Sequence, residues 1–345
     1  MNLLPEKLRS MTPYAPSAGS YAVRLDANES PFDLPMLAKE AFLHELLTTP
    51  LNRYPDASAA ALCAAFGARY GVEPRFIMAG NGSDELISLL LSSFLAKGDT
   101  LLLASPDFSM YRFYAELSEV KLASCQRGAE FGGAELEAAL EQSGAKAVIF
   151  SNPCNPTGAG IPRASLRPLI QKREDVLFLV DEAYMDFWDQ TLLGDAPALS
   201  NLIVLRTLSK AWGAAGLRLG FAVSNPALIS ALNTARSPYN VSTPAQIMGR
   251  ILLEQGENHG VFLMGQARRL ERRLKQLLPG ARVFPTHTNF VYLETENAVQ
   301  IYEYLKKQGI IIRLFGQGAL RITASFDEEL GALYAALEKM TEEQK

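Results

Sequence analysis

A lysine, an arginine and two hydroxyl residues lie close together in the stretch TLSKAWGAAGLRLG. Thr207 and Ser209 closely precede Lys210, and Arg218 follows it eight residues later. A guanidinium can pair with a phosphate dianion through a fork of hydrogen bonds, while hydroxyl groups fill the remaining lone pairs. The stretch therefore predicts a phosphate cradle beside Lys210. An isolated Ser-Lys pair in a Gly/Ala-rich loop would be a solvated surface feature, so the prediction depends on the residues around it.

A glycine-rich turn, GNGSDE, offers a second phosphate element. It leads into a helix that we expect to begin near Ser83, where free backbone N–H groups and the positive end of the helix dipole would face an anion. Glu85 stands where the dinucleotide-binding fingerprint has its last glycine, so that fingerprint is incomplete. Taken alone, such a turn before a helix is usually only a turn.

Polar side chains follow the apolar runs that we interpret as strands. In an open parallel sheet, ligands bind beyond the carboxyl ends of the strands. Asp181 ends one such run, and a carboxylate there is costly without a partner such as a protonated heterocyclic nitrogen. The alternative is that Asp181 caps the next segment. Asn155 and Tyr184 could donate hydrogen bonds to a phenolate oxygen, and Phe108 could stack on a flat ring.

The elements that must position these residues follow an α/β pattern. Between Thr100 and Val223 short β-rich runs recur, and most are separated by stretches long enough for a helix. Apolar runs of this kind suit strands that are buried on both faces, so we expect a mainly parallel sheet. The runs are TLLLA, VKLAS, AVIFS, VLFLV, NLIVLR and LGFAV. Asn225 followed by Pro226 predicts the start of a helix.

The pattern changes after about Pro244. A long charged helical stretch is expected to reach about Leu278, and a final helix should open with a capping box from Ser325 to Glu328. Between them lie NFVYLE, a helix, IIIRL and ALRITA, which together indicate a smaller α+β domain. A length of 345 residues allows about two domains. We place an N-terminal arm at 1–25, a large domain at 26–240 and a small domain at 241–345.

Composition excludes several classes of function. The chain has 33 Lys and Arg against 37 Asp and Glu, so it lacks the surplus of positive charge that nucleic-acid binding requires. Its three cysteines and three histidines show no ligand spacing, and we expect no metal and no disulfide framework. The beginning of the sequence lacks the apolar stretch of a signal peptide, and no run approaches the length of a membrane span. We therefore expect a cytoplasmic protein.

The motifs NPCNPTG, DEAY and TLSKAWGAAGLRLG, in this order, resemble those of fold-type I pyridoxal-phosphate aminotransferases, class II. Within that superfamily the chain is similar to the histidinol-phosphate aminotransferase family along nearly its whole length. Further matching motifs are MTPY, LDANESPF, NRYPD, GNGSDE, SPDFSMY, THTNF and LRIT. The resemblance implies a large domain with a mainly parallel seven-stranded sheet sandwiched by helices, and a smaller α+β C-terminal domain. It also implies a homodimer with shared active sites.

The resemblance implies an activity and residue roles. The activity is transamination between histidinol phosphate and 2-oxoglutarate in histidine biosynthesis, with pyridoxal 5'-phosphate as cofactor. Lys210 would form the internal aldimine and act as general base, Asp181 would pair with the pyridine nitrogen, and Asn155 and Tyr184 would contact the ring oxygen. Phe108 would cover the ring. The cofactor phosphate would be held by Gly82, Ser83, Asp84, Thr207, Ser209, Arg218 and the partner subunit's Tyr54, and the substrate by Tyr14, Asn28, Arg313 and Arg321.

Two features depart from the family pattern, and they leave alternatives open. Cys154 stands where the family commonly has Asn. The segment from Arg313 to Arg321 is shorter than the corresponding segment of some relatives. Arg321 resembles an arginine that binds a substrate carboxylate. Arg313 would add the second positive charge that a phosphate favours. The alternative for Arg313 is a surface residue at a strand end. The alternatives are an aromatic amino-acid aminotransferase and an enzyme like threonine-phosphate decarboxylase. A non-catalytic pyridoxal-binding regulator is disfavoured, because the chain lacks the length and basic charge for a DNA-binding domain.

Overall fold

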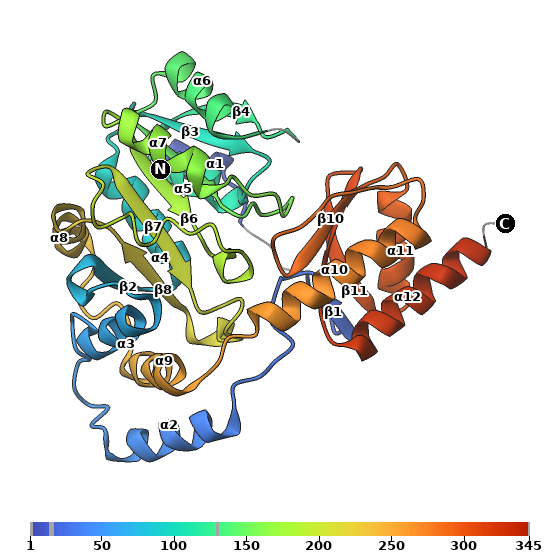
Figure 1. Ribbon diagram of the computed structural model, residues 1–345, viewed down its shortest axis with the longest axis horizontal. Coiled ribbons are helices and arrows are strands. Elements are labelled where there is room, and N and C mark those ends of the chain that lie inside the picture. Colours follow the sequence, from blue (N-terminus) through green and yellow to red (C-terminus); the bar gives the residue numbers. More distant parts are fainter. Residues whose placement is uncertain (1–2, 14–16, 129–130, 344–345) are drawn as a thin grey trace.

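The computed structural model describes residues 3–13, 17–128 and 131–343, and its strands form two sheets (Figure 1). The larger sheet has seven strands in the order β2-β8-β7-β6-β5-β3-β4. They are β2 (Ile77–Asn81), β3 (Thr100–Ser105), β4 (Lys121–Gln126), β5 (Ala147–Ser151), β6 (Leu177–Asp181), β7 (Leu202–Thr207) and β8 (Leu219–Val223). Only β8 runs against its neighbours within this sheet. The expected mainly parallel sheet is therefore confirmed, and the six apolar runs of the sequence correspond to β3 through β8.

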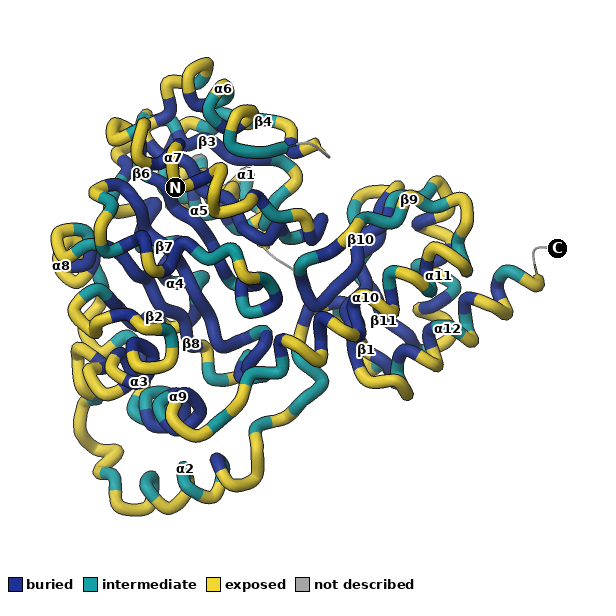
Figure 2. Tube along the Cα trace, in the orientation of Figure 1, coloured by how far each residue is buried: buried dark blue, intermediate teal, exposed yellow. Residues whose placement is uncertain are grey.

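Helices cover both faces of this sheet, as predicted. Successive residues of a strand point to opposite faces, and β3 accordingly contributes Leu102 to one hydrophobic core and Leu101 to the other. The first core is closed by α3 (Ala60–Tyr70), α6 (Gly133–Ser143), α7 (Arg163–Lys172) and α9 (Thr243–Gln255). The second is closed by α4 (Gly82–Phe94), α5 (Ser109–Leu117) and α8 (Pro226–Ala235). The central strands are consequently buried along their length (Figure 2).

A smaller five-stranded sheet lies beside the large one. Its order is β1-β11-β12-β10-β9, from β1 (Val23–Leu25), β9 (Arg282–Val283), β10 (Phe290–Glu294), β11 (Ile310–Phe315) and β12 (Ala319–Thr323). One face packs against α10 (Gly260–Leu277), α11 (Ala298–Lys307) and α12 (Asp327–Glu342). The short β1 pairs in parallel with β11, so the N-terminal segment supplies an edge strand to this sheet.

Two further helices and three short turns complete the described part of the chain. The helices are α1 (Glu6–Ser10) and α2 (Met36–Thr48), and the 3-10 turns lie at Pro74–Phe76, Met185–Phe187 and Ala215–Leu217. The predicted start of α8 is confirmed, because the Asn225 side chain accepts hydrogen bonds from the N–H groups of Ala227 and Leu228. This cap satisfies two backbone donors that the helix leaves without an internal partner.

Two predictions for the C-terminal third are wrong. The single helical stretch from Pro244 to Leu278 is divided into α9 and α10, because α9 packs on the large sheet through α2 and α3 whereas α10 packs under the small sheet. The capping box from Ser325 to Glu328 does not form. The Ser325 hydroxyl donates to the Glu329 carboxylate instead, and the helix begins at Asp327. The predicted domain ranges stay a prediction, and the packing of α9 favours a boundary between α9 and α10.

Candidate active site

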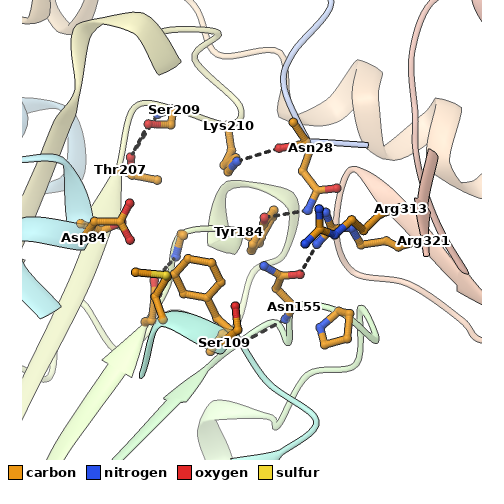
Figure 3. Close-up of a pocket in the computed structure, with 18 of the residues that line it drawn as sticks. Asn28, Asp84, Ser109, Asn155, Tyr184, Thr207, Ser209, Lys210, Arg313 and Arg321 are labelled. Atoms are coloured by element: carbon orange, nitrogen blue, oxygen red, sulfur yellow. Dashed lines mark hydrogen bonds between the residues drawn. The ribbon is translucent and has the colours of Figure 1, made fainter. Parts of the chain in front are cut away.

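A cavity of about 610 Å³ lies between the carboxyl ends of the large-sheet strands and the small sheet. Lys210, Asp181, Asn155 and Tyr184 all line it, so the acid, amide, phenol and lysine meet at one edge. In Figure 3, Thr207, Ser209 and Asp84 lie on one side, Arg313 and Arg321 lie on the other, and Lys210 and Tyr184 lie between them. The cavity thus has two positively charged or donor-rich ends and a reactive amine in the middle.

The first end has the composition of a phosphate cradle. The hydroxyl oxygens of Thr207 and Ser209 are 2.9 Å apart, and the Ser209 N–H donates to Thr207 Oγ1. Arg218 Nη2 lies 3.5 Å from a carboxylate oxygen of Asp84, at the start of α4. A bound anion would therefore meet two hydroxyls, a guanidinium and the positive end of a helix dipole.

Two backbone positions make this cradle narrow. Gly82 has a φ of +83°, and a Cβ added there would lie 2.8 Å from Arg218 Nη2. Gly220 on β8 faces the same turn, and a Cβ there would lie 2.5 Å from the carbonyl carbon of Gly82 and the nitrogen of Ser83. Only glycine allows the start of α4 to approach β8 and Arg218 this closely.

Asp181 ends β6 and is buried at the bottom of the cavity. Tyr111 on α5 donates to its Oδ2 at 2.7 Å, and the Ala183 N–H donates to its Oδ1 at 3.0 Å. Burial raises the pKa of Asp181 to about 6, although the hydrogen bond from Tyr111 opposes this rise. The carboxyl therefore lacks a cationic partner within the described chain, and a protonated ring nitrogen is a group that would stabilise its charge.

The amine of Lys210 lies over the phenol of Tyr184. Lys210 Nζ is 5.8 Å from the centroid of the Tyr184 ring and donates to the carbonyl oxygen of Ala27 at 3.3 Å. The Tyr184 hydroxyl accepts a hydrogen bond of 2.8 Å from Asn28 Nδ2. Asn28 has a φ of +54° and is held by mutual hydrogen bonds with Thr323 on β12. The small sheet therefore orients a phenol that belongs to the large one.

Phe108 and Asn155 form walls of the cavity between its two ends. Phe108 immediately precedes α5 and lies edge-on to Tyr111, with ring centroids 5.5 Å apart. Asn155 follows β5, and its Oδ1 accepts a hydrogen bond from Arg321. The Nδ2 group of Asn155 is thus the one that can donate to a ligand oxygen.

The second end of the cavity contains two arginines on adjacent strands. Arg313 on β11 and Arg321 on β12 are direct partners in the antiparallel register, and both line the cavity. Arg321 also donates from Nη2 to the Asp26 carbonyl oxygen at 2.8 Å. Like charges directly opposite each other destabilise a sheet, and an anion between them removes that cost.

Three of the predicted site residues are not among the described residues that line the cavity, and the role of Tyr54 in a partner's site stays a prediction. Tyr54 does not line the cavity of a single chain; it is 80% exposed and stacks on Tyr239 with ring centroids 4.5 Å apart. Tyr14 lies outside the described residues. Gly82 shapes the cradle through its backbone rather than lining it.

Sequence reasoning missed Tyr111, Asp107 and Ser151, which all line the cavity. Tyr111 stands three residues after Phe108, in a stretch between two predicted strands that is long enough for a helix. In a helix this spacing places both side chains on one face, so the signal was available. Asp107 and Ser151 interact across two strand ends, and no local pattern identifies such a contact.

A search of the described ranges finds no cluster of His, Cys, Asp and Glu that could hold a metal ion. Within the same ranges, none of the helices has the length and apolar character that a membrane crossing needs.

The residues of the cavity fit pyridoxal phosphate. The group needs an amine for covalent attachment, an anion site for its phosphate and a carboxylate for its ring nitrogen. Lys210, the cradle of Thr207, Ser209 and Arg218, and the buried Asp181 supply these in one cavity. The close approach at Gly82 leaves the backbone N–H groups of α4 available to the phosphate.

Comparisons with known proteins agree with this geometry. The model of the aminotransferase class I and II family matches residues 21–337. The histidinol-phosphate aminotransferase of Thermoanaerobacter pseudethanolicus is 34% identical over 98% of this chain and 99% of its own length. That of Pyrococcus furiosus is 32% identical over 98% of both chains.

A solved structure supports the fold. The histidinol-phosphate aminotransferase of Sinorhizobium meliloti, in complex with pyridoxal-5'-phosphate, superposes with a TM-score of 0.89 at 22% identity. The superposition covers 100% of this chain and 99% of that chain. The family model and the relatives above show that the chain belongs to the aminotransferase class I and II family, as a pyridoxal-phosphate-dependent aminotransferase similar to the histidinol-phosphate aminotransferases.

Proposed function

We propose that this enzyme transfers an amino group between histidinol phosphate and 2-oxoglutarate, a step of histidine biosynthesis. The observation that carries the proposal is the pair of arginines, Arg313 and Arg321, opposite each other at the end of the cavity away from the cofactor cradle. A phosphate monoester carries about −1.5 to −2 charge at neutral pH, so two guanidinium groups match it better than they match a carboxylate. The names of the relatives in the comparisons support the same substrate.

The residues of this chain divide the work of transamination. Bound pyridoxal phosphate supplies an electron-accepting ring and an aldehyde carbon at which amino groups are exchanged. Lys210 Nζ is the amine placed to attach the group and then to move a proton at the substrate carbon as a general base. Asp181 would keep the ring nitrogen of the bound group protonated, and burial of the carboxylate would strengthen that ion pair.

The remaining side chains orient the ring. Asn155 Nδ2 and the Tyr184 hydroxyl would donate to the ring oxygen, and Asn28 helps to hold Tyr184. Phe108 would cover one ring face. The cofactor phosphate would be held by Thr207, Ser209, Arg218 and the backbone N–H groups from Gly82 to Asp84.

Two other activities use the same Lys210 and Asp181. An aromatic amino-acid aminotransferase would need one arginine for a carboxylate, and a threonine-phosphate decarboxylase would also bind a phosphate. The L-threonine-O-3-phosphate decarboxylase of Porphyromonas gingivalis shares the fold, with a TM-score of 0.81 at 21% identity. A fold likeness at that identity carries no substrate assignment.

A screen of single half-reactions separates these activities. The cofactor-loaded enzyme is mixed in turn with histidinol phosphate, phenylalanine, tyrosine and threonine phosphate, and the absorbance of the bound cofactor is followed. We expect histidinol phosphate to give the highest second-order rate constant for the half-reaction. A preference for phenylalanine or tyrosine, or carbon dioxide release from threonine phosphate, would reject the proposal.

Replacement of Arg313 tests the anion assignment directly. Arg313→Ala should lower kcat/KM for histidinol phosphate by about 10- to 150-fold, the loss of one charge-assisted hydrogen bond of roughly 1.5–3 kcal/mol. It should affect phenylalanine far less, because a carboxylate needs one arginine. Steady-state kinetics with both substrates in wild type and variant decide the question. Equal losses for the two substrates would leave Arg313 with a structural role only.

A homodimer with shared active sites completes the proposal. Tyr54 is exposed and outside the cavity of its own chain, as a residue that serves a partner's site would be. Beside it in sequence, α2 presents an apolar outer face that is exposed in one chain (Figure 2). That face consists of Met36, Leu37, Leu43, Leu47 and, after the helix, Leu51. Apolar patches of this kind usually mark protein interfaces.

The cytoplasm is the location that the sequence favours.

A further inference from the structure

A buried ion pair joins three strand ends behind the cavity. Arg127, directly after β4, donates from Nη1 to Asp107 Oδ2 at 2.9 Å and to the Ser151 carbonyl oxygen at 2.9 Å. The side chains of Arg127 and Asp107 are only 3% and 5% exposed. Because β4, β3 and β5 are neighbours in that order, Arg127 crosses the end of β3 to reach the end of β5.

Two short hydrogen-bond routes lead from this pair to the walls of the cavity. Along the first, the Phe108 N–H donates to Asp107 Oδ1 at 2.8 Å. Along the second, the Ser151 hydroxyl donates to Asp107 and accepts a bond of 2.9 Å from the Asn155 N–H. The Ser151 N–H also donates to Asp107, at 3.1 Å. One carboxylate thus holds the backbone beside both Phe108 and Asn155.

We propose that Arg127 and Asp107 are positioning residues. Through Ser151 they fix Asn155 against the ring oxygen of bound pyridoxal phosphate, and through the Phe108 N–H they fix Phe108 against the ring face. The inference rests on the roles proposed above for Asn155 and Phe108. Arg127 does not line the cavity, so direct contact with substrate does not account for an effect of its replacement.

The chemistry of the carboxylate explains why an arginine is needed. Asp107 receives bonds from the Ser151 N–H, the Ser151 hydroxyl and the Phe108 N–H, so it must act only as an acceptor. Burial raises the pKa of Asp107 to about 6, and Arg127 opposes that rise. Without Arg127 the buried carboxyl would bind a proton more readily, and the resulting O–H would replace an acceptor with a donor. The hydrogen bonds that link Asp107 through the Ser151 hydroxyl to the Asn155 N–H would then weaken.

The spectrum of the bound cofactor gives a readout that is independent of turnover. An amide that donates to the ring oxygen competes with the internal hydrogen bond between that oxygen and the protonated nitrogen attached to Lys210. The absorbance of the bound cofactor changes when that nitrogen loses its proton. A weaker hydrogen bond from Asn155 should therefore raise the pH at the midpoint of this absorbance change. The loss of one hydrogen bond corresponds to a rise of about 0.5–1 pH unit.

The experiment compares four variants of the cofactor-loaded enzyme. Arg127→Met removes the charge and Arg127→Lys keeps it. Ser151→Ala removes the hydroxyl that links Asp107 to the Asn155 N–H and leaves both members of the Arg127–Asp107 ion pair in place. The control is Asn201→Ala. Asn201 is a buried amide that donates to three backbone carbonyls at the opposite edge of the sheet, before β7. Its loss should lower Tm without touching the cavity.

We expect the midpoint to rise in Arg127→Met and Ser151→Ala, to rise less in Arg127→Lys, and to stay unchanged in Asn201→Ala. The dissociation constant for pyridoxal phosphate should increase in parallel with the midpoint. If Arg127→Met does not fold, Ser151→Ala alone decides the matter. An unchanged midpoint in Ser151→Ala, or an equal rise in Asn201→Ala, would overturn the inference. A wild-type protein without the visible absorbance of an attached cofactor would instead overturn the proposed function itself.

Discussion

At the scale of single residues, burial controls the chemistry of the cavity floor. Asp181 and Asp107 are both buried carboxyls with a pKa of about 6, yet their partners differ. Arg127 neutralises Asp107, whereas Asp181 has only neutral donors from Tyr111 and Ala183. Asp181, the acid that lacks a cationic partner among the described residues, lines the centre of the site and is available to a protonated cofactor nitrogen.

Lys210→Ala should abolish transamination and leave the fold intact. The lysine makes no ion pair within the described residues, and its amine donates a long hydrogen bond of 3.3 Å to the Ala27 carbonyl oxygen. Loss of the general base alone lowers rates by roughly 10²–10⁴-fold, and loss of the covalent anchor adds to this. Activity assays combined with circular dichroism provide the measurement. Near wild-type activity would show that Lys210 is not the reactive amine.

Asp181→Asn should stabilise the apoprotein at neutral pH relative to wild type. The pKa of the buried carboxyl in the folded state lies above its unfolded value, so the folded state binds the extra proton and stability falls as pH rises from about 4 to about 6. Ionisation of this group then lowers the free energy of unfolding by about 3 kcal/mol above that range. The asparagine variant avoids this loss but should lose most activity.

Urea unfolding of both apoproteins at about pH 4 and about pH 7 tests this prediction. The difference in free energy of unfolding, variant minus wild type, should become more positive at the higher pH. A pH-independent difference would mean that Asp181 pays no desolvation cost when it ionises.

At the scale of elements, the contact between β8 and the start of α4 creates the phosphate cradle. β2 pairs antiparallel with β8, so the end of β2 lies beside the start of β8. Because α4 begins directly after β2, its first turn also lies beside β8. Gly220 and Gly82 lie face to face at the junction. The cradle therefore depends on a close approach of two backbones, which a side chain would prevent.

Gly220→Ala should weaken pyridoxal phosphate binding by at least about 10-fold. Its Cβ would lie within 2.5 Å of backbone atoms of Gly82 and Ser83, so the start of α4 must shift. Fluorescence titration of the apoprotein measures the dissociation constant. Gly331→Ala is the matched control, because the same methyl group on α12 meets open space. Equal affinities in the two variants would show that the cradle tolerates the shift.

At the scale of the whole molecule, the site lies between two sheets and is expected to lie between two chains. The two sheets lie side by side (Figure 1). Strand ends of the large sheet supply Lys210 and Asp181, and the small sheet supplies Arg313 and Arg321. A substrate that reaches the cofactor with its amine and the arginines with its anion would contact both sheets. Tyr54 would add a contribution from a second chain.

Mixing two inactive parents tests the shared site. In a hybrid of Tyr54→Ala with Lys210→Ala, one site receives both defects and the other receives neither, so activity should recover to at most about one quarter of the wild-type value after random exchange. Analytical ultracentrifugation should show a dimer. Tyr54→Ala must first be impaired by itself. Hybrids that recover nothing, or an active monomer, would rule out the shared site.

The sequence alone determined the strands and the residues at their ends. Six of the seven strands of the large sheet follow from apolar runs, because burial on both faces requires continuous apolar sequence. Lys210, Asp181 and Asn155 follow from their positions just after those runs, since parallel strands end at one edge. The cap at Asn225 depends only on neighbouring residues and was equally predictable.

Only the tertiary structure decided which strand ends are neighbours. Tyr111 reaches Asp181 across seventy positions, and Arg127 reaches Asp107 across twenty, because strand order brings those ends together. The division of the long C-terminal helical stretch has the same origin: α9 and α10 share a helical pattern, but each packs on a different sheet. Local periodicity reports which face of an element is buried, whereas the partner that buries it is set by contacts distant in sequence.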